Sequence, residues 1–248
     1  MDRVQLLEAE LNQECPKHRS SRSSGGDVAR RVLVSVAPAV ILGCLGFAQI
    51  SDALGSLTYV TSNPSWPIVI QFARELTYGA FVLAAAVVLW KKRIVRARDA
   101  RWKAAAVSLT GSFLLVGARF VPAGPVVWSG SLRTSAIGLL VTAVGSILAL
   151  AALSSLKWNF SIIPEVRLLV VSGPYRWLRH PMYFAELLMI VGLALGGLRI
   201  VYLVGALCVL GLQIYRIRLE EQLLSSTFPK AHQEFVTRTR FRLIPFVW

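Results

Sequence analysis

The chain has 248 residues, of which 55% are hydrophobic, and a formal net charge of +14. Ordinary soluble domains average about 45–50% apolar residues, so this composition points to a membrane protein. The positive charge does not indicate a nucleic-acid partner, because Lys and Arg fall in clusters between apolar segments. Three scattered cysteines and three distant histidines exclude a disulfide framework and give no metal-binding spacing.

The first 31 residues are polar and are expected to form a largely disordered tail. A Ser/Gly stretch at 20–26 is typical of a flexible segment, and a short helix is expected over 4–14. This tail does not have the order of a cleavable signal peptide, since the first apolar run comes after it.

Six apolar segments follow the tail, near 32–50, 68–90, 104–121, 134–153, 183–198 and 199–215. A spanning helix needs roughly 20 apolar residues, and the first four segments reach or approach that length. The last two are short for two spans, so a tight hairpin that extends into its polar flanks is expected. The sequence therefore predicts an all-α, polytopic transmembrane bundle of about six spans, with four helices in 32–153 and two in a core at 154–248.

The basic residues predict the orientation of this bundle. The tail, the C-terminal end and two loops hold most of the Lys and Arg residues: six in 1–31, seven in 91–103, four in 154–182 and six in 216–248. The opposite side receives Arg119, Arg133 and Arg199, and its loops at 51–67 and 119–133 are rich in Pro and Gly. The positive-inside rule then places both termini in the cytoplasm.

The segment 172–186, SGPYRWLRHPMYFAE, is the densest polar and aromatic cluster in the chain. Gly173 and Pro174 should break the chain, and Pro181 suits the first position of a helix capped near His180. The helix start offers free N–H groups and a positive dipole end, which suit a phosphate or carboxylate. The alternative is an interfacial belt, in which Trp and Tyr lie at headgroup depth and Arg binds lipid phosphates.

Two further features place charge beside apolar sequence. Glu186 lies about one and a half turns into an apolar helix, where a carboxylate indicates a functional site, unless it pairs with an Arg near the interface. In RIRLEEQLL, the spacing predicts ion pairs between Arg216 and Glu220 and between Arg218 and Glu221. Arg216 and Glu221 are about 140° apart on an ideal helix, so both reach one ligand only if the site wraps around the helix.

The C-terminal segment reads as a short amphipathic helix at 230–237 followed by the basic and aromatic RTRFRLIPFVW. Two interpretations are open for it. The end of the chain is a membrane-surface anchor, or it folds back as a lid over the two preceding clusters.

The three clusters, in this order, resemble the superfamily of isoprenylcysteine carboxyl methyltransferases and phospholipid methyltransferases, which are integral membrane enzymes. The matching text is NFSIIPEVRLLVVSGPYRWLRHPMYFAE, then RIRLEEQLL, then FRLIPFVW, within residues 154–248. The element GPYR…RHPMY followed by an EE-bearing helix is specific in combination, whereas RHP alone would be weak. The first four spans contain no motif of this superfamily.

The resemblance implies S-adenosylmethionine as the methyl donor, in a pocket at the cytoplasmic face, and a lipophilic acceptor that enters from the membrane lipids. It implies three groups of site residues: Tyr175, Arg179, His180, Pro181, Tyr183 and Glu220 for the cofactor, Arg216 and Glu221 for catalysis beside the acceptor, and Arg176 and Glu186 for acceptor binding. No metal is implied.

Four functions are weighed on this basis. O-methylation of a lipophilic carboxylate comes first, because that acceptor is already ionised and needs no general base. N-methylation of a phospholipid amine would need a base, such as Glu186, Glu221 or His180. An NADPH-dependent reductase of the sterol type and a non-enzymatic membrane protein that binds a lipid or partner are the other two. Ala/Val/Arg-rich usage favours a bacterial inner membrane, and thus a small lipid or secondary metabolite as acceptor.

The predicted orientation can be tested by cysteine labelling. Single cysteines placed in the loop at 91–103 and in both termini, in a chain without its native cysteines, should react only when reagent reaches the cytoplasm. Labelling of residue 98 from outside the cell would contradict the six-span arrangement.

Overall fold

The computed structural model describes the following residues: 36–62, 65–90, 97–98, 106–111, 114, 122, 124–156, 160, 162, 165–166 and 169–247. The N-terminal tail, most of the basic loop at 91–103 and most of the predicted third span lie outside these ranges.

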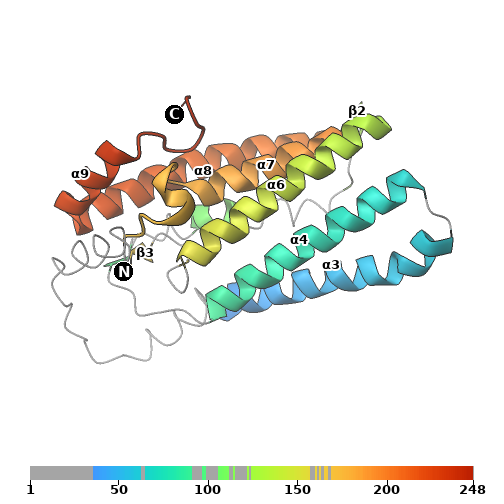
Figure 1. Cartoon of the computed structure of the whole chain (residues 1–248), viewed down its shortest axis with the longest axis horizontal. Coiled ribbons are helices and arrows are strands. Elements are labelled where there is room, and N and C mark those ends of the chain that lie inside the picture. Colours follow the sequence, from blue (N-terminus) through green and yellow to red (C-terminus); the bar gives the residue numbers. More distant parts are fainter. Residues whose placement is uncertain are drawn as a thin grey trace.

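Long helices dominate the described residues, which confirms the all-α membrane fold (Figure 1). Four of them are long and apolar enough to cross a membrane, and the apolar α7 (Pro181–Gly196) is shorter. The four are α3 (Ala37–Ser62), α4 (Trp66–Trp90), α6 (Leu132–Leu156) and α8 (Ile200–Thr227). Helix α3 packs on α4, α4 reaches α6, and α6 packs along α7.

Two helices run further than the apolar segments predict. Helix α3 continues to Ser62, so the loop expected at 51–67 is shorter than predicted. Pro38 lies in the first turn of α3, where a proline is tolerated, and the next proline in the sequence is Pro64. A proline disfavours helix in the residue before it, which explains why the helix ends near this point. Helix α8 has 28 residues, or about 42 Å at 1.5 Å per residue. It exceeds the roughly 30 Å hydrocarbon core, so one end extends into polar surroundings, as predicted.

Two short strand pairs join loops that were predicted on the same side of the membrane. Strand β1 (Ala97–Arg98) pairs antiparallel with β3 (Glu165–Val166). At the other end, β2 (Val126–Ser129) pairs antiparallel with β4 (Gly197–Arg199), which forms the turn between α7 and α8. Neither pair was predicted, because strands this short leave no periodic pattern in the sequence.

Helices α6 and α7 approach closely because small residues face each other. A Cβ on Gly138 would lie 2.4 Å from the carbonyl oxygen of Gly192, and one on Gly192 would lie 2.3 Å from Thr142 Oγ1. Without a hydrophobic driving force in lipid, such close contact supplies the attraction between helices. Thr142 satisfies its hydroxyl within its own helix, by donating to the Gly138 carbonyl at 2.8 Å.

This contact predicts the effect of adding one methyl group. Gly192→Ala should force α6 and α7 apart and destabilise the protein by about 1–3 kcal/mol. Gly211→Ala on α8 is the matched control, since a Cβ there meets nothing within 4 Å. It should be neutral or stabilise the helix by up to about 1 kcal/mol. Thermal unfolding of both variants in one detergent measures the difference, and equal midpoints would contradict the close packing.

Candidate functional site at the start of α7

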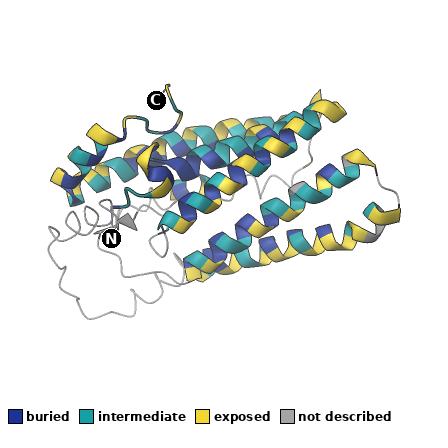
Figure 2. Ribbon diagram, in the orientation of Figure 1, coloured by how far each residue is buried: buried dark blue, intermediate teal, exposed yellow. Residues whose placement is uncertain are grey.

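The loop before α7 bends where the sequence predicted. A 3₁₀ turn, η4 (Gly173–Arg176), buries Pro174 and Tyr175 against the end of α6. Gly173 has φ +59, and a Cβ there would lie 2.2 Å from Ser155 Oγ, so only glycine fits this turn. Burial raises the pKa of the Tyr175 phenol far above its usual value, which keeps it neutral. Figure 2 shows that buried residues gather where this loop meets α7.

Helix α7 begins at Pro181 with His180 as the N-cap residue, as the proline predicted. His180 is 6% exposed, and its side chain does not cap the helix. The first N–H groups of an α-helix have no partner within the helix, so this end can donate to an anion.

The C-terminal residues 239–243, here called the strap, fold back onto this loop. The Arg179 and His180 amides donate to the carbonyls of Phe241 and Arg242, each at 3.0 Å. The Thr239 hydroxyl donates to the carbonyls of Tyr175 and Arg176 at 3.4 and 3.3 Å. The strap thus matches the interpretation of a lid that folds back, and α9 (Pro229–Arg238) leads into it.

Beyond the strap, the chain projects outward. Phe246 is 89% exposed and Val247 is 77% exposed, so these two side chains are free to contact the membrane surface.

Arg179 ties three segments together. Its Nε donates to the Thr239 carbonyl at 2.7 Å and one Nη to the Arg240 carbonyl at 3.1 Å. The other Nη donates to Glu221 Oε1 on α8 at 3.0 Å. Arg242 of the strap adds a second cation, with Nε 3.1 Å from Glu221 Oε2. One guanidinium therefore links the loop, the strap and α8.

Glu220 is next to Glu221 in the sequence, but its carboxylate contacts different residues. The Tyr183 hydroxyl donates to Glu220 Oε1, and Arg216 Nε lies 3.4 Å from the same oxygen. The pairing of Arg216 with Glu220 is confirmed. Arg218 is exposed and does not pair with Glu221, whose carboxylate faces Arg179 instead.

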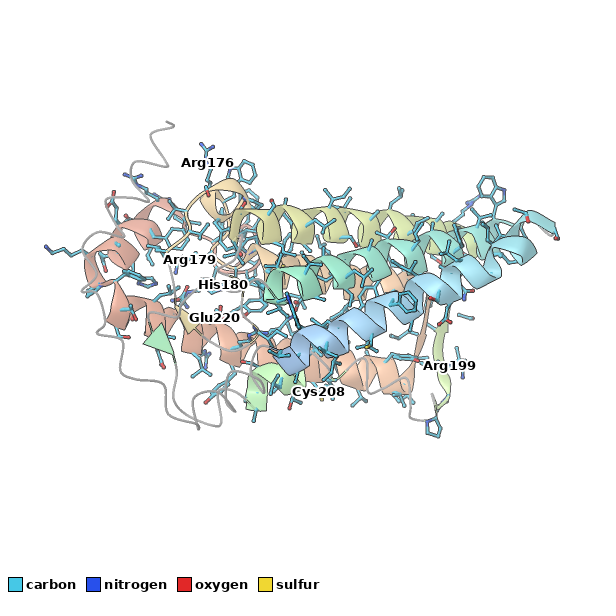
Figure 3. The ribbon with its side chains drawn as sticks, turned by 90° about the horizontal axis from the view of Figure 1, so that it is seen from below. Arg176, Arg179, His180, Arg199, Cys208 and Glu220 are labelled. Carbon is cyan, nitrogen blue, oxygen red and sulfur yellow. The ribbon has the colours of Figure 1, made fainter. Side chains whose placement is uncertain are left out.

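His180 lies between these two carboxylates. Its Nδ1 is 3.6 Å from Glu220 Oε2, and its Nε2 is 3.6 Å from Glu221 Oε1 (Figure 3). The imidazole stacks on Tyr183 with ring centroids 5.7 Å apart, and the Arg216 guanidinium lies 4.9 Å from the same Tyr183 ring. The cluster thus wraps around α8, which is how Arg216 and Glu221 belong to one site despite the 140° between them.

Glu186 lies one turn further along α7 and has a partner that the sequence did not predict. Gln213 Nε2 on α8 donates to Glu186 Oε2 at 2.7 Å, and Arg216 interacts electrostatically with the same carboxylate. Gln213 precedes Arg216 by three positions and shares its helix face. A lone glutamine in an apolar helix was the only signal that could have identified it.

Two residues stand apart from the predictions. Arg176 is exposed and points away from Arg179, His180 and Glu220 (Figure 3), so the structure does not bring it to the cluster. His232 on α9 was not singled out, yet it interacts electrostatically with Glu221 and Arg179. Burial lowers the pKa of His232, which favours its neutral form.

The fold and the cluster together describe a class of protein: an integral membrane helical bundle with a charged and aromatic candidate site at one end. Residues 134–231 match the model of the phospholipid methyltransferase family. For this part of the chain, the match confirms the resemblance to the superfamily of phospholipid and isoprenylcysteine carboxyl methyltransferases. The match begins within α6, before the predicted core at 154–248. No curated protein was found to match the chain.

The hydrogen bonds of Arg179 should hold the strap in place against local unfolding. Arg179→Met should remove three hydrogen bonds and expose the chain at Arg238 and Arg240 to trypsin. Since a hydrogen bond to a charged group contributes about 1.5–3 kcal/mol, we expect cleavage there to rise at least about 10-fold. Arg218→Met, at an exposed arginine of α8, is the control. Equal cleavage rates would contradict the role of Arg179.

Proposed function

We propose that the chain is an S-adenosylmethionine-dependent membrane methyltransferase whose acceptor is a lipophilic amine. The family match supports a methyltransferase that acts on lipid. The observation that carries the proposal is the position of His180 between Glu220 and Glu221, directly at the start of α7.

The residues of the cluster fit the groups of S-adenosylmethionine. The uncapped start of α7 suits its carboxylate, and Glu220 and Glu221 suit its ammonium and sulfonium. The buried rings of Tyr175 and Tyr183 suit the adenine or the sulfonium face. His180 Nε2 is buried, and Glu221 Oε1 at 3.6 Å is beyond hydrogen-bond distance, so a ligand that reaches this nitrogen would satisfy it.

When bound, the cofactor supplies an electrophilic methyl group on a sulfonium centre. The protein then has to position the acceptor in line and exclude water, which proximity and desolvation accomplish. Arg216 is held by Glu220 and the Tyr183 ring, and in this proposal it lies between the methyl donor and the acceptor. The strap closes the site from the polar side.

The acidic side chains support an amine as the acceptor. An ammonium must lose a proton before its lone pair can attack, and Glu186 is placed in the apolar helix to receive that proton. The deprotonated nitrogen would then be able to accept the methyl group that the cofactor supplies.

O-methylation of a carboxylate, placed first by the sequence, is the second candidate. It would rest on Arg216, whose guanidinium is engaged by Glu220.

We further propose that both termini and this site face the cytoplasm of a bacterial inner membrane, as the basic loops indicate. Residues 154–248 would then hold the chemistry, and the four preceding helices would complete the bundle around the acceptor.

Calorimetry with the detergent-purified protein tests the proposal. Wild type should bind S-adenosylmethionine at micromolar concentration, and His180→Ala and Glu221→Gln should each weaken binding at least about 10-fold, since each removes a buried charged or polar contact. Glu234→Gln, on the exposed face of α9, should bind as wild type does.

Unchanged binding in both site variants would contradict the placement of the cofactor. If folded wild type does not bind S-adenosylmethionine, the methyltransferase proposal is wrong. Binding of NADPH would then be measured, and a lack of that binding would favour a non-enzymatic role.

A further inference from the structure

The α7–α8 contact contains a sequence of polar pairs that leads from the cluster into the apolar part of the helices. His180, Tyr183 and Glu186 follow at intervals of three along α7. Tyr183 meets Arg216, and one turn further along α7 Glu186 meets Gln213. Residues three apart lie about 4.5 Å apart along a helix. The Glu186–Gln213 pair is therefore the deepest polar step beyond the proposed cofactor site.

Gln213 is only 3% exposed, and its Oε1 has no hydrogen-bond partner. The amide is oriented by Glu186, because its Nε2 must donate to the carboxylate, and its carbonyl oxygen is left over. A buried polar atom without a partner costs about 1–3 kcal/mol. Native structures rarely keep such an atom without a reason, such as a ligand that satisfies it.

The atom of this pair that lacks a partner is an acceptor, Gln213 Oε1, and the second N–H of Gln213 Nε2 is the one donor that Glu186 does not use. The bond from Gln213 uses one side of Glu186 Oε2, while Gln213 Oε1 and the remaining carboxylate lone pairs can accept further hydrogen bonds. A ligand group that fits must donate, as N–H or O–H does. A carboxylate fits poorly, because it cannot donate to Gln213 Oε1 and it brings a second negative charge beside Glu186.

We propose that Gln213 is a specificity-determining residue that receives, together with Glu186, an N–H donor of the acceptor's amine headgroup. This inference rests on the proposed function. It assigns the selection among acceptors to the Glu186–Gln213 pair, because the cluster at His180 does not account for it. Gln213 orients the nitrogen, while Glu186 provides the charge. A quaternary ammonium has no N–H to donate, so the pair also disfavours a fully methylated product.

Amphiphiles of equal chain length test this role in the absence of S-adenosylmethionine. Dodecylamine has N–H donors, dodecyltrimethylammonium has the charge without donors, and dodecanoate has the opposite charge. Calorimetry in one detergent should show wild type binding dodecylamine at least about 10-fold more tightly than the other two. Equal binding of the amine and the trimethylammonium would overturn the proposal, and this comparison needs no variant.

Variants locate the effect. Gln213→Met should lower the affinity for dodecylamine about 10-fold and leave that for dodecyltrimethylammonium unchanged, because only the hydrogen bond is lost. Gln213→Glu keeps an acceptor oxygen and should retain the preference for the amine. Thr142→Val, at an equally buried polar residue of α6, is the matched control. An unchanged affinity for dodecylamine in Gln213→Met would overturn the role of Gln213.

Cofactor binding separates this inference from the proposed function. Gln213→Met should bind S-adenosylmethionine as wild type does, and with a methyl-accepting amine it should show a raised KM. Failure of wild type to bind the cofactor would overturn the methyltransferase, whereas an amine preference that does not depend on Gln213 would overturn only the inference.

Discussion

The two adjacent carboxylates of Glu220 and Glu221 lie at the end of an apolar helix, where each must be compensated by the protein. Neighbouring helix positions point about 100° apart, so a single partner cannot serve both. Glu220 is matched by Tyr183 and Arg216 on the α7 side, and Glu221 by Arg179 and Arg242 on the side of the loop and strap. Removing one partner of a buried ion pair costs up to about 3–5 kcal/mol, which applies to the pairs of Arg179 with Glu221 and Arg216 with Glu220, whereas Arg242 is 41% exposed and contributes less.

The chain order explains how this compensation also builds a site. The loop before α7 and the end of α8 are brought to the same place by the turn at β4, and the strap returns the chain to the loop. His180 lies at the centre because it is the N-cap residue of α7 and its ring nitrogens lie 3.6 Å from both carboxylates. The uncapped start of α7, two carboxylates and two buried tyrosine rings thus adjoin a path of polar side chains into the apolar helices. That arrangement suits the polar donor and lipophilic acceptor proposed above.

The sequence predicted the elements that depend on composition and local signals. Apolar length predicted the helices, Pro181 predicted the start of α7, and four-residue spacing predicted the pair of Arg216 with Glu220. Contacts between distant segments could not be predicted in this way. Glu221 was expected to pair with Arg218, but the fold supplies Arg179 and Arg242, which approach from other segments. Gln213 was missed because its meaning depends on Glu186, 27 positions away in the chain.

Hydrogen–deuterium exchange with and without S-adenosylmethionine tests the central claim most directly, that three segments around His180 form one cofactor site. The account predicts that the cofactor slows exchange together in the loop at 172–180, in the first turn of α7 and in the strap at 239–243, while α3 and α4 are unchanged. Protection confined to one of these segments, or protection that appears in α3 and α4 instead, would contradict it.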